Sequence, residues 1–298
     1  MLKAVIDLGT NTFNLLVARW YNNQLESVFS TKEGVALGMG GILNNEISPE
    51  AKERAIECLK KFRKICDSLE VTEIRAIGTS ALRDAKKIRT FCEQVYAETG
   101  IFIEIVSGLR EADLIWKGIS YSHTFTSRSL VMDIGGGSTE FILASERGIL
   151  QTASFNIGVS RILQARNFQD PMNIDDIRYI EEFLESNTQA FFETLQADTL
   201  IGASGSFETF FEMHNKVNYP KGFSTQTMPF DQFISILEKL IKSTQAERDH
   251  HPFILPIRKK MAPIAAVKTR WVVQKLKAKN LIISPCSLKE GVLVEMEL

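Results

Sequence analysis

The sequence predicts an α/β protein built from two similar lobes. One observation is that apolar runs typical of strands alternate with helical patterns along the 298 residues, as expected for sheets covered by helices. A second is an internal repeat, because residues 4–18 (AVIDLGTNTFNLLVA) return as residues 130–144 (LVMDIGGGSTEFILA). A third is that residues 77–80 (IGTS) return as residues 201–204 (IGAS) at nearly the same offset. The length also suits two domains of about 100–200 residues each.

The first lobe is predicted to span residues 1–123. Ser48 and Pro49 indicate a helix start, because Ser is a favoured N-cap and Pro suits the first helical position. Ser107 is predicted to cap a later helix in the same way. The predicted elements are a three-stranded meander over 6–37, a helix over 48–69, a strand over 73–78, a helix over 87–98, a strand over 101–106 and a helix over 107–121.

The second lobe is predicted to repeat this order over residues 124–287. Its repeated segment again indicates a strand, a tight turn and an antiparallel strand. Apolar periodicity predicts helices near 175–195, 231–243 and 261–277, and a last strand over 281–284.

The composition excludes several classes of protein. Apolar residues make up 44% and charged residues 24%, which is typical of a soluble globular protein and excludes a disordered or collagen-like chain. No apolar run approaches the ~20 residues of a membrane span, and the N-terminal residues contain no signal-peptide core. The four Cys form no C-x-x-C pair, and the four His show no zinc spacing. We therefore expect a cytoplasmic protein with reduced thiols and no membrane partner.

Charge is distributed unevenly along the chain. The formal net charge is −1, yet residues 250–289, called the basic tract here, contain nine Lys or Arg and no Asp or Glu. Two interpretations stay open: the basic tract binds an anionic partner, or it forms a solvated helix face. The residues that we expect to contact a polyanion are Arg258, Lys259, Lys260 and Arg270.

The two repeated turns are predicted to bind phosphate groups. Their residues are Gly9, Thr10, Asn11 and Thr12 in the first lobe and Gly135, Gly136, Gly137, Ser138 and Thr139 in the second. Such turns leave backbone N–H groups exposed, and three glycines allow a bulky anion to approach closely. Asp7 and Asp133 precede the turns and are predicted to reach a magnesium ion on the phosphates, directly or through water. We expect a cleft between the lobes that holds two neighbouring phosphoryl groups.

The chain, with these two turns, resembles the exopolyphosphatase / guanosine pentaphosphate phosphohydrolase (Ppx/GppA) family. The resemblance rests on five segments that stand in the family's order and spacing: 7–12 (DLGTNT), 78–83 (GTSALR), 107–112 (SGLREA), 133–140 (DIGGGSTE) and 202–205 (GASG). It implies two ribonuclease-H-like lobes of the actin, sugar-kinase and heat-shock ATPase fold. It also implies that 288–298 returns to the first lobe, and that this is the family's short, two-lobe form.

The resemblance assigns roles to individual residues. It implies that Glu111 is the catalytic glutamate that orients and deprotonates the attacking water, and that Glu140 is a second acid near the metal and the water. It further implies phosphate binding by Arg83 and, more loosely, by Arg258, and metal-side roles for Asp7, Asp133 and Glu140, with Mg²⁺ or Mn²⁺ as the ion.

Simpler interpretations of two of these residues stay open. Glu111 is also an acid in the first turn of a capped helix, where the helix dipole favours it. Arg83 is also a plausible partner for Asp84 or for a helix C-terminus.

The resemblance implies hydrolysis of phosphoanhydride bonds. Inorganic polyphosphate is the first expected substrate, and guanosine pentaphosphate or tetraphosphate is the second. Departures from the family pattern at 204–207 (SGSF) and 258–266 leave this choice open. A kinase of the same fold and a non-catalytic polyphosphate or alarmone sensor are the alternatives, and the presence of Glu111 favours an enzyme. We expect no nucleic-acid partner and leave a homodimer open.

Overall fold

The computed structural model describes residues 1–297, and the chain divides into two compact units. Unit 1 comprises Met1–Gly118 together with the segment that starts at Leu288, and unit 2 comprises Ile119–Ser287. The boundary between the units therefore lies five residues before the 123/124 boundary suggested by the sequence. None of the helices within residues 1–297 combines the length and apolar character needed to cross a bilayer.

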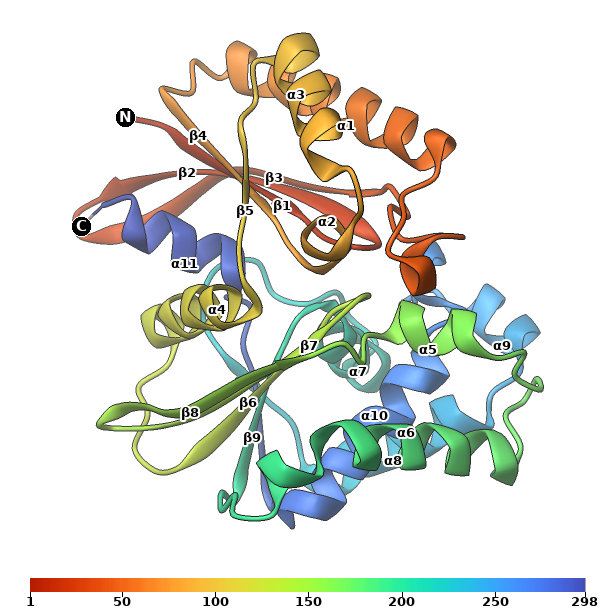
Figure 1. The fold of residues 1–298 in the computed structure, drawn as a ribbon. Coiled ribbons are helices and arrows are strands. Elements are labelled where there is room, and N and C mark those ends of the chain that lie inside the picture. The colour runs from red at the N-terminus through yellow and green to blue at the C-terminus, as the bar shows by residue number, and fades with distance from the viewer. Residues whose placement is uncertain (298) are drawn as a thin grey trace. The chain divides into compact units, whose positions relative to one another are not determined.

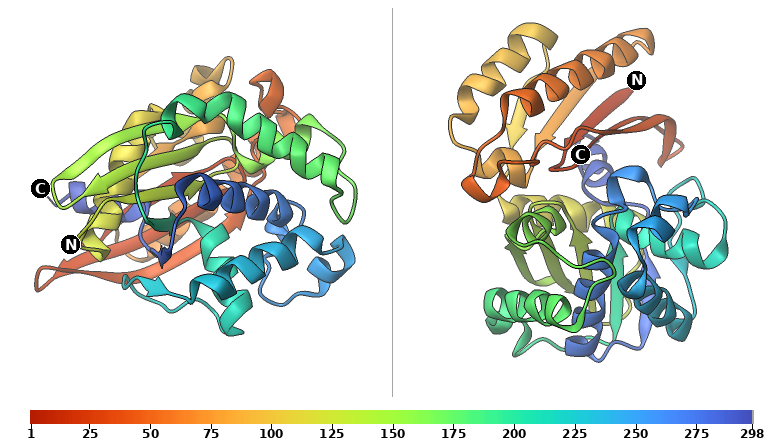
Figure 2. Two further views of the ribbon diagram at one scale, coloured as in Figure 1. Left: turned by 90° about the horizontal axis from the view of Figure 1, so that it is seen from below. Right: turned by 90° about the vertical axis from the view of Figure 1, so that its right-hand side faces the viewer.

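Unit 1 is a five-stranded sheet with helices on both faces (Figure 1). The strand order is β3-β2-β1-β4-β5, with β1, β2 and β3 antiparallel and β4 and β5 parallel to β1. Helices α1 and α3 lie side by side on one face, and α4 and α11 lie on the other (Figures 1 and 2). The strands are β1 (Lys3–Leu8), β2 (Thr12–Tyr21), β3 (Gln24–Gly34), β4 (Glu73–Gly78) and β5 (Ile103–Ile105). The helices are η1 (Ile42–Asn44), α1 (Pro49–Ser68), α2 (Ser80–Asp84), α3 (Ile88–Thr99), α4 (Gly108–Ser122), whose last four residues belong to unit 2, and α11 (Leu288–Glu295).

Unit 2 is a six-stranded sheet with the order β10-β11-β9-β6-β7-β8. Helix α10 packs against α6 and α8 and forms the centre of the core of this unit, so that nearly all of its side chains are buried (Figure 1). The strands are β6 (Ser129–Ile134), β7 (Thr139–Ser145), β8 (Gly148–Phe155), β9 (Thr199–Ala203), β10 (Gln226–Thr227) and β11 (Asn280–Ile283). The helices are α5 (Val159–Ala165), α6 (Ile174–Phe192), α7 (Gly205–Asn215), α8 (Phe230–Lys242), α9 (Gln245–His250), η2 (Pro256–Arg258) and α10 (Ala262–Leu276).

The two units share one topology, which confirms the predicted α/β fold with two similar lobes. The order β3-β2-β1-β4-β5 of unit 1 corresponds strand for strand to β8-β7-β6-β9-β11 of unit 2. The repeat also extends to the register of the hairpins. Asp7 pairs with Asn14 across β1 and β2, and Asp133 pairs with Glu140 at the equivalent position of β6 and β7.

Most predicted elements of unit 1 are found close to their expected positions. Helix α1 begins at Pro49, and Oγ of Ser48 accepts a hydrogen bond of 3.2 Å from the amide of Ala51. The strand predicted over 101–106 is shorter, because β5 pairs only with the last three residues of β4. In unit 2 the sequence patterns did not predict α5, α9 and β10, which are short, or α7, which has 11 residues.

Helix α11 is held in unit 1 by an ion cluster around Glu295. The carboxylate of Glu295 accepts hydrogen bonds from Arg75 at 3.0 Å, from Lys117 at 2.7 Å and from Arg110. Partial burial acts to raise the pKa of Glu295, but these three donors outweigh it and hold the pKa at about 2. The backbones of α11 and α4 also approach so closely that a Cβ at Gly291 would lie 1.7 Å from the carbonyl oxygen of Leu114.

Candidate functional site

The glycine loop of unit 2, residues 135–138, is held by the N-terminus of α5. The amides of Gly158, Val159 and Ser160 donate to the carbonyls of Gly137, Gly135 and Gly136 at 3.1, 3.1 and 2.8 Å. In a trans peptide unit, the C=O of one residue and the N–H of the next point in opposite directions. The N–H groups of residues 136–138 therefore point away from α5, as a row of three donors suited to an anion.

The turn of unit 1 is held in the same manner by the segment that follows β3. The amides of Gly38 and Ala36 donate to the carbonyls of Thr10 and Asn11 at 3.0 and 2.8 Å. By the same peptide geometry, the N–H groups of residues 11 and 12 point away from that segment. Both turns also require glycine at the same position, because a Cβ at Gly9 or Gly135 would lie 2.9 Å from a carbonyl oxygen of its own turn.

The residues that precede and follow each turn differ between the units. In unit 1, Asp7 faces Asn14, whose Nδ2 donates a hydrogen bond of 3.0 Å to Oδ2 of Asp7. In unit 2, Asp133 faces a second carboxylate, Glu140, because directly opposed residues of an antiparallel pair lie on one face of the sheet. Of the two repeated hairpins, only the one in unit 2 therefore carries a pair of opposed acids.

The carboxylates of Asp7, Asp133 and Glu140 each accept a hydrogen bond from a polar side chain. Oγ of Ser154 donates 2.7 Å to Glu140, which is almost fully buried, and Oγ of Ser287 donates to Asp133. In unit 1, burial raises the pKa of Asp7, and the charge of Lys289 and the hydrogen bond from Asn14 oppose that rise.

The carboxylates of Asp133 and Glu140 have the chemistry of ligands for a magnesium ion. Residues 1–297 contain no group of three or more His, Cys, Asp or Glu side chains placed to hold an ion. Mg²⁺, however, is ordinarily held by one or two carboxylates together with water and substrate phosphates. Two like charges on opposed strands also repel each other, and a divalent cation relieves that repulsion. The pair Asp133 and Glu140 therefore fits a magnesium ion that arrives with a phosphate substrate.

Unit 1 brings Glu111 and Arg83 together. Glu111 lies in the first turn of α4, where Oγ of Ser107 accepts a hydrogen bond of 3.2 Å from the amide of Arg110. Oε2 of Glu111 accepts a hydrogen bond of 2.8 Å from Nη1 of Arg83, which lies on α2. The same nitrogen also donates 3.3 Å to the carbonyl of Val106.

This pairing bears on the two simpler interpretations of the sequence. The side chains of Glu111 and Arg83 are only 10% and 18% exposed to solvent, so the contact is a shielded ion pair. Asp84 lies farther from Arg83, at 3.9 Å. Arg83 therefore binds mainly to Glu111, and the acid at the start of α4 has a partner beyond the helix dipole.

Arg258 makes its contacts with the first turn of α7. Its Nη1 donates to the carbonyl of Gly205 at 2.6 Å and to Oγ1 of Thr209 at 3.1 Å, and Glu208 lies 3.7 Å from Nη2. A Cβ at Gly205 would lie 1.4 Å from the guanidinium, so any larger residue there would displace the side chain of Arg258. The predicted phosphate contact of Arg258 stays a prediction.

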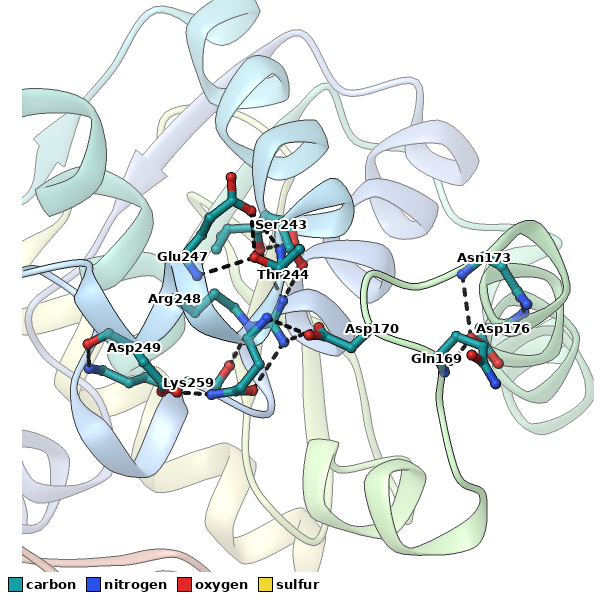
Figure 3. A network of polar contacts seen from close by, with 12 residues as sticks. Gln169, Asp170, Asn173, Asp176, Ser243, Thr244, Glu247, Arg248, Asp249 and Lys259 are labelled. Atoms are coloured by element: carbon teal, nitrogen blue, oxygen red, sulfur yellow. Dashed lines mark hydrogen bonds and ion pairs between the residues drawn. The ribbon is translucent and has the colours of Figure 1, made fainter.

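The basic tract is free of acids in sequence but not in space, and the predicted polyanion contacts of its residues stay predictions. Arg270 is bound by Glu181 and Glu238 at 2.9 Å each, and Arg258 is bound to α7 as described above. The ammonium group of Lys259 donates to the carbonyl of Asp249 (Figure 3). Lys260 is exposed.

Two further cations of the tract are also engaged. Lys275 forms an ion pair with Glu185, and Lys268 is completely buried. The acids come from α6, α7 and α8, which precede the tract in the sequence and pack against it. The tract is thus not one continuous cationic surface.

Figure 3 shows how α9, which ends at the first residue of the tract, is fixed. Buried Arg248 donates to the carbonyl of Lys259 at 2.8 Å, to Asp170 at 2.9 Å and to the backbone and hydroxyl of Ser243. These contacts join three segments of unit 2, so Arg248 has a structural role.

Sequence reasoning missed Lys268 as a site residue. Its Nζ donates to Oγ1 of Thr139 at 2.7 Å and to the carbonyl of Ile157. Burial lowers its pKa to about 7, and the charge of Glu140 opposes that shift. The signal was present in the sequence, because Lys268 lies on the apolar face of its helix, with Ile264 and Trp271 one turn away on either side.

Comparison with known proteins identifies similar sequences. A model of the Ppx/GppA phosphatase family matches residues 16–298. A guanosine-5'-triphosphate,3'-diphosphate pyrophosphatase of Vibrio parahaemolyticus is 33% identical over 221 residues, which is 71% of this chain and 43% of that protein. A bifunctional 3-dehydroquinate synthase/phosphatase of Fusobacterium nucleatum is 40% identical over 172 residues, which is 55% of this chain and 26% of that protein. The chain thus spans less than half the length of these curated relatives.

Solved structures include proteins of the same length as this chain. An exopolyphosphatase from Cytophaga hutchinsonii is 33% identical and superposes with a TM-score of 0.95, covering 99% of this chain and 97% of that one. The Ppx-GppA enzyme of Aquifex aeolicus is 24% identical and superposes with a TM-score of 0.82, covering 99% of both chains. The second comparison supports the fold alone.

Proposed function

The chain belongs to the Ppx/GppA phosphatase family, and we propose that it is a metal-dependent hydrolase of phosphoanhydride bonds that releases terminal phosphate from inorganic polyphosphate. In this proposal unit 1 supplies a water-activating carboxylate with a guanidinium beside it. Unit 2 supplies the glycine loop and the paired acids.

The observation that carries the proposal is the ion pair between Glu111 and Arg83. Phosphoryl transfer to water needs an oriented, deprotonated nucleophile and cationic groups that stabilise the charge on the phosphoryl oxygens. A carboxylate and a guanidinium held 2.8 Å apart provide both kinds of group. Arg83 orients Glu111 before substrate arrives. When phosphate binds, the five N–H donors of Arg83 are enough to contact both the phosphate and the carboxylate.

The glycine loop of unit 2 is the proposed binding element for phosphoryl oxygens. The row of N–H groups from residues 136–138 donates to the anion, and the hydroxyl of Ser138 adds a further donor. Because α5 already fixes the loop through three hydrogen bonds, little reorganisation is needed on binding. The turn at residues 9–12 is the corresponding element of unit 1.

Asp133 and Glu140 are the residues that would hold Mg²⁺ or Mn²⁺, and Asp7 is a further acid on the metal side. When bound, such an ion neutralises charge on the phosphate oxygens. Ser287 and Ser154 orient the two carboxylates of unit 2 through hydrogen bonds. Ser287 and Ser154 are therefore positioning residues for this pair.

The choice of polyphosphate over guanosine pentaphosphate rests on the relatives. The exopolyphosphatase of Cytophaga hutchinsonii aligns with this chain over nearly its whole length. The Vibrio pyrophosphatase, at the same identity, is matched over less than half of its length. The basic tract no longer favours polyphosphate, because most of its cations are bound to acids, bound to backbone carbonyls or buried. Guanosine pentaphosphate is the second candidate, on the strength of the Vibrio relative.

The proposal is tested by measuring phosphate release from polyphosphates of three lengths and from guanosine pentaphosphate, side by side, with and without Mg²⁺. We expect magnesium-dependent release of orthophosphate from the first turnover, with a higher kcat/KM for polyphosphate. A reversed ranking would support the guanosine alternative. Binding without release of phosphate would support a sensor.

A further inference from the structure

Lys268 is a completely buried lysine at the centre of unit 2. It lies on α10 among apolar side chains, and its two hydrogen-bond partners, a hydroxyl and a carbonyl, are uncharged. A buried ammonium with neutral partners costs free energy, because the protein interior solvates charge poorly. Packing alone does not account for a lysine here, since an apolar residue of similar length would fill the same space at no such cost.

The two partners of Lys268 lie at the two segments that build the glycine loop. Thr139 directly follows the loop and begins β7. Ile157 directly precedes the three amides, those of residues 158–160, that bind the loop carbonyls. Nζ of Lys268 therefore joins the end of the loop to the segment that holds it.

Unit 1 provides an internal comparison for this lysine. Its turn has the equivalent backbone hydrogen bonds from the segment after β3. The residue equivalent to Thr139 is Phe13, which is buried in an apolar cluster. A turn of this kind therefore folds with only apolar packing behind it. The hydroxyl and the lysine are features of the loop in unit 2, where the carboxylate pair also lies.

We propose that Lys268 is a positioning residue for phosphate binding by the glycine loop: it fixes Thr139 and Ile157 and, in its protonated form, adds a buried positive charge at the end of the loop. Charges interact more strongly in a protein interior than in water, so this ammonium stabilises a bound anion and partly offsets the two carboxylates of unit 2. The inference rests on the phosphate-binding role of the loop in the proposed function.

The test uses the full chain and the substitutions Lys268→Met and Lys268→Gln. Met fills the same space without the charge, and Gln keeps a hydrogen-bond donor without the charge. Lys275→Met is the matched control, because Lys275 lies on the same helix but is exposed and paired with Glu185. Binding of inorganic triphosphate is measured by titration calorimetry, and the melting temperature is measured without ligand.

We expect Lys268→Met to bind triphosphate roughly ten- to a hundredfold more weakly, the range for losing a hydrogen bond to a charged group. Its melting temperature without ligand should be unchanged or higher, since a buried charge whose hydrogen-bond partners are both neutral has been removed. The affinity of Lys268→Gln for triphosphate should lie between those of the wild type and of Lys268→Met. Lys275→Met should bind triphosphate as the wild type does. A lower melting temperature with affinity within twofold of wild type would show that Lys268 is only structural.

A double-mutant cycle tests the contact itself and remains informative if one variant folds poorly. Thr139→Val removes the hydroxyl and keeps the shape of the side chain. If Lys268 acts through Thr139, the two substitutions should weaken triphosphate binding by less together than the product of their separate effects. Fully additive effects would overturn this part of the inference.

Failure of the inference is distinguishable from failure of the proposed function. A wild-type protein that binds triphosphate in a Lys268-dependent manner but releases no phosphate would overturn only the hydrolase proposal. A wild-type protein that hydrolyses polyphosphate, with Lys268→Met equally active and equally able to bind, would overturn only the inference. No triphosphate binding by the wild type would overturn both.

Discussion

Nη1 of Arg83 donates a hydrogen bond of 2.8 Å to Oε2 of Glu111, and this contact joins two residues that are 28 positions apart in the sequence. Arg83 lies on α2, which follows β4, and Glu111 lies on α4, which follows β5. The strands β4 and β5 are parallel neighbours, so the helices that follow them start at the same edge of the sheet. The topology of unit 1 thus produces the ion pair.

Substitution of Arg83 tests its predicted phosphate contact. Arg83→Met should lower kcat/KM for polyphosphate by roughly 10²-fold or more, the usual effect of removing one group that stabilises charge in the transition state. Arg83→Lys should recover only part of this loss, because an ammonium lacks the fork of donors that contacts two groups at once. Steady-state kinetics measure both effects, with Arg89→Met as the control, since Arg89 is exposed and pairs with Glu93 on its own helix. Wild-type kinetics in Arg83→Met would exclude Arg83 from the site.

Substitution of Asp133 tests the proposed metal site. Asp133→Asn should raise the Mg²⁺ concentration for half-maximal activity by at least the roughly 10–100-fold found for outer partners of metal ligands, because an amide oxygen binds Mg²⁺ more weakly than a carboxylate. A magnesium titration of the activity measures the shift. Asp175→Asn, on the exposed side of α6, should leave the titration unchanged. An unaltered titration in Asp133→Asn would remove Asp133 from the metal site.

The ion cluster around Glu295 predicts how stability depends on pH. The folded-state pKa of Glu295 is about 2 and its ordinary value is 4.5, so the ionised carboxylate stabilises the fold above about pH 4.5. This contribution is lost progressively as the pH falls from about 4.5 towards 2. Glu295→Gln should therefore lower the free energy of unfolding at pH 7 by about 1–3 kcal/mol, with a lower melting temperature as the result, and should have a smaller effect near pH 3.

The measurement is thermal unfolding between pH 7 and pH 3 in wild type and Glu295→Gln. Glu57→Gln is the control, because Glu57 is largely exposed and pairs with Lys60 on the same helix. An equal loss of stability at both ends of the pH range would show that the charge of Glu295 contributes little.

The sequence predicted the features of the fold that are encoded locally. The repeat at residues 4–18 and 130–144 is visible because each hairpin needs an aspartate, small turn residues and two apolar strands within 15 residues. The start of α1 at Pro49 is visible for the same reason, since its cap is set by adjacent residues.

Contacts between segments distant in sequence could not be predicted. The pairing of Glu111 with Arg83 depends on which strands lie side by side. The basic tract was expected to be open to anions because its sequence holds no acid, yet Glu181 and Glu238 reach Arg270 from α6 and α8. Both helices lie outside the tract, so the charge of the tract's own sequence was a poor guide to the surface.

The central claim, that Glu111 activates the attacking water, is tested most directly by the rate of phosphate release from polyphosphate by Glu111→Gln. The account predicts a kcat that is lower by roughly 10²–10⁴-fold, the range for losing a general base, with substrate affinity kept or improved because a negative charge near the phosphates is gone. Glu104→Gln is the matched control, since Glu104 is also an acid of unit 1 that pairs with an arginine, Arg75, at 2.6 Å, and its kcat should be unchanged. A Glu111→Gln protein that releases phosphate at nearly the wild-type rate would contradict the account.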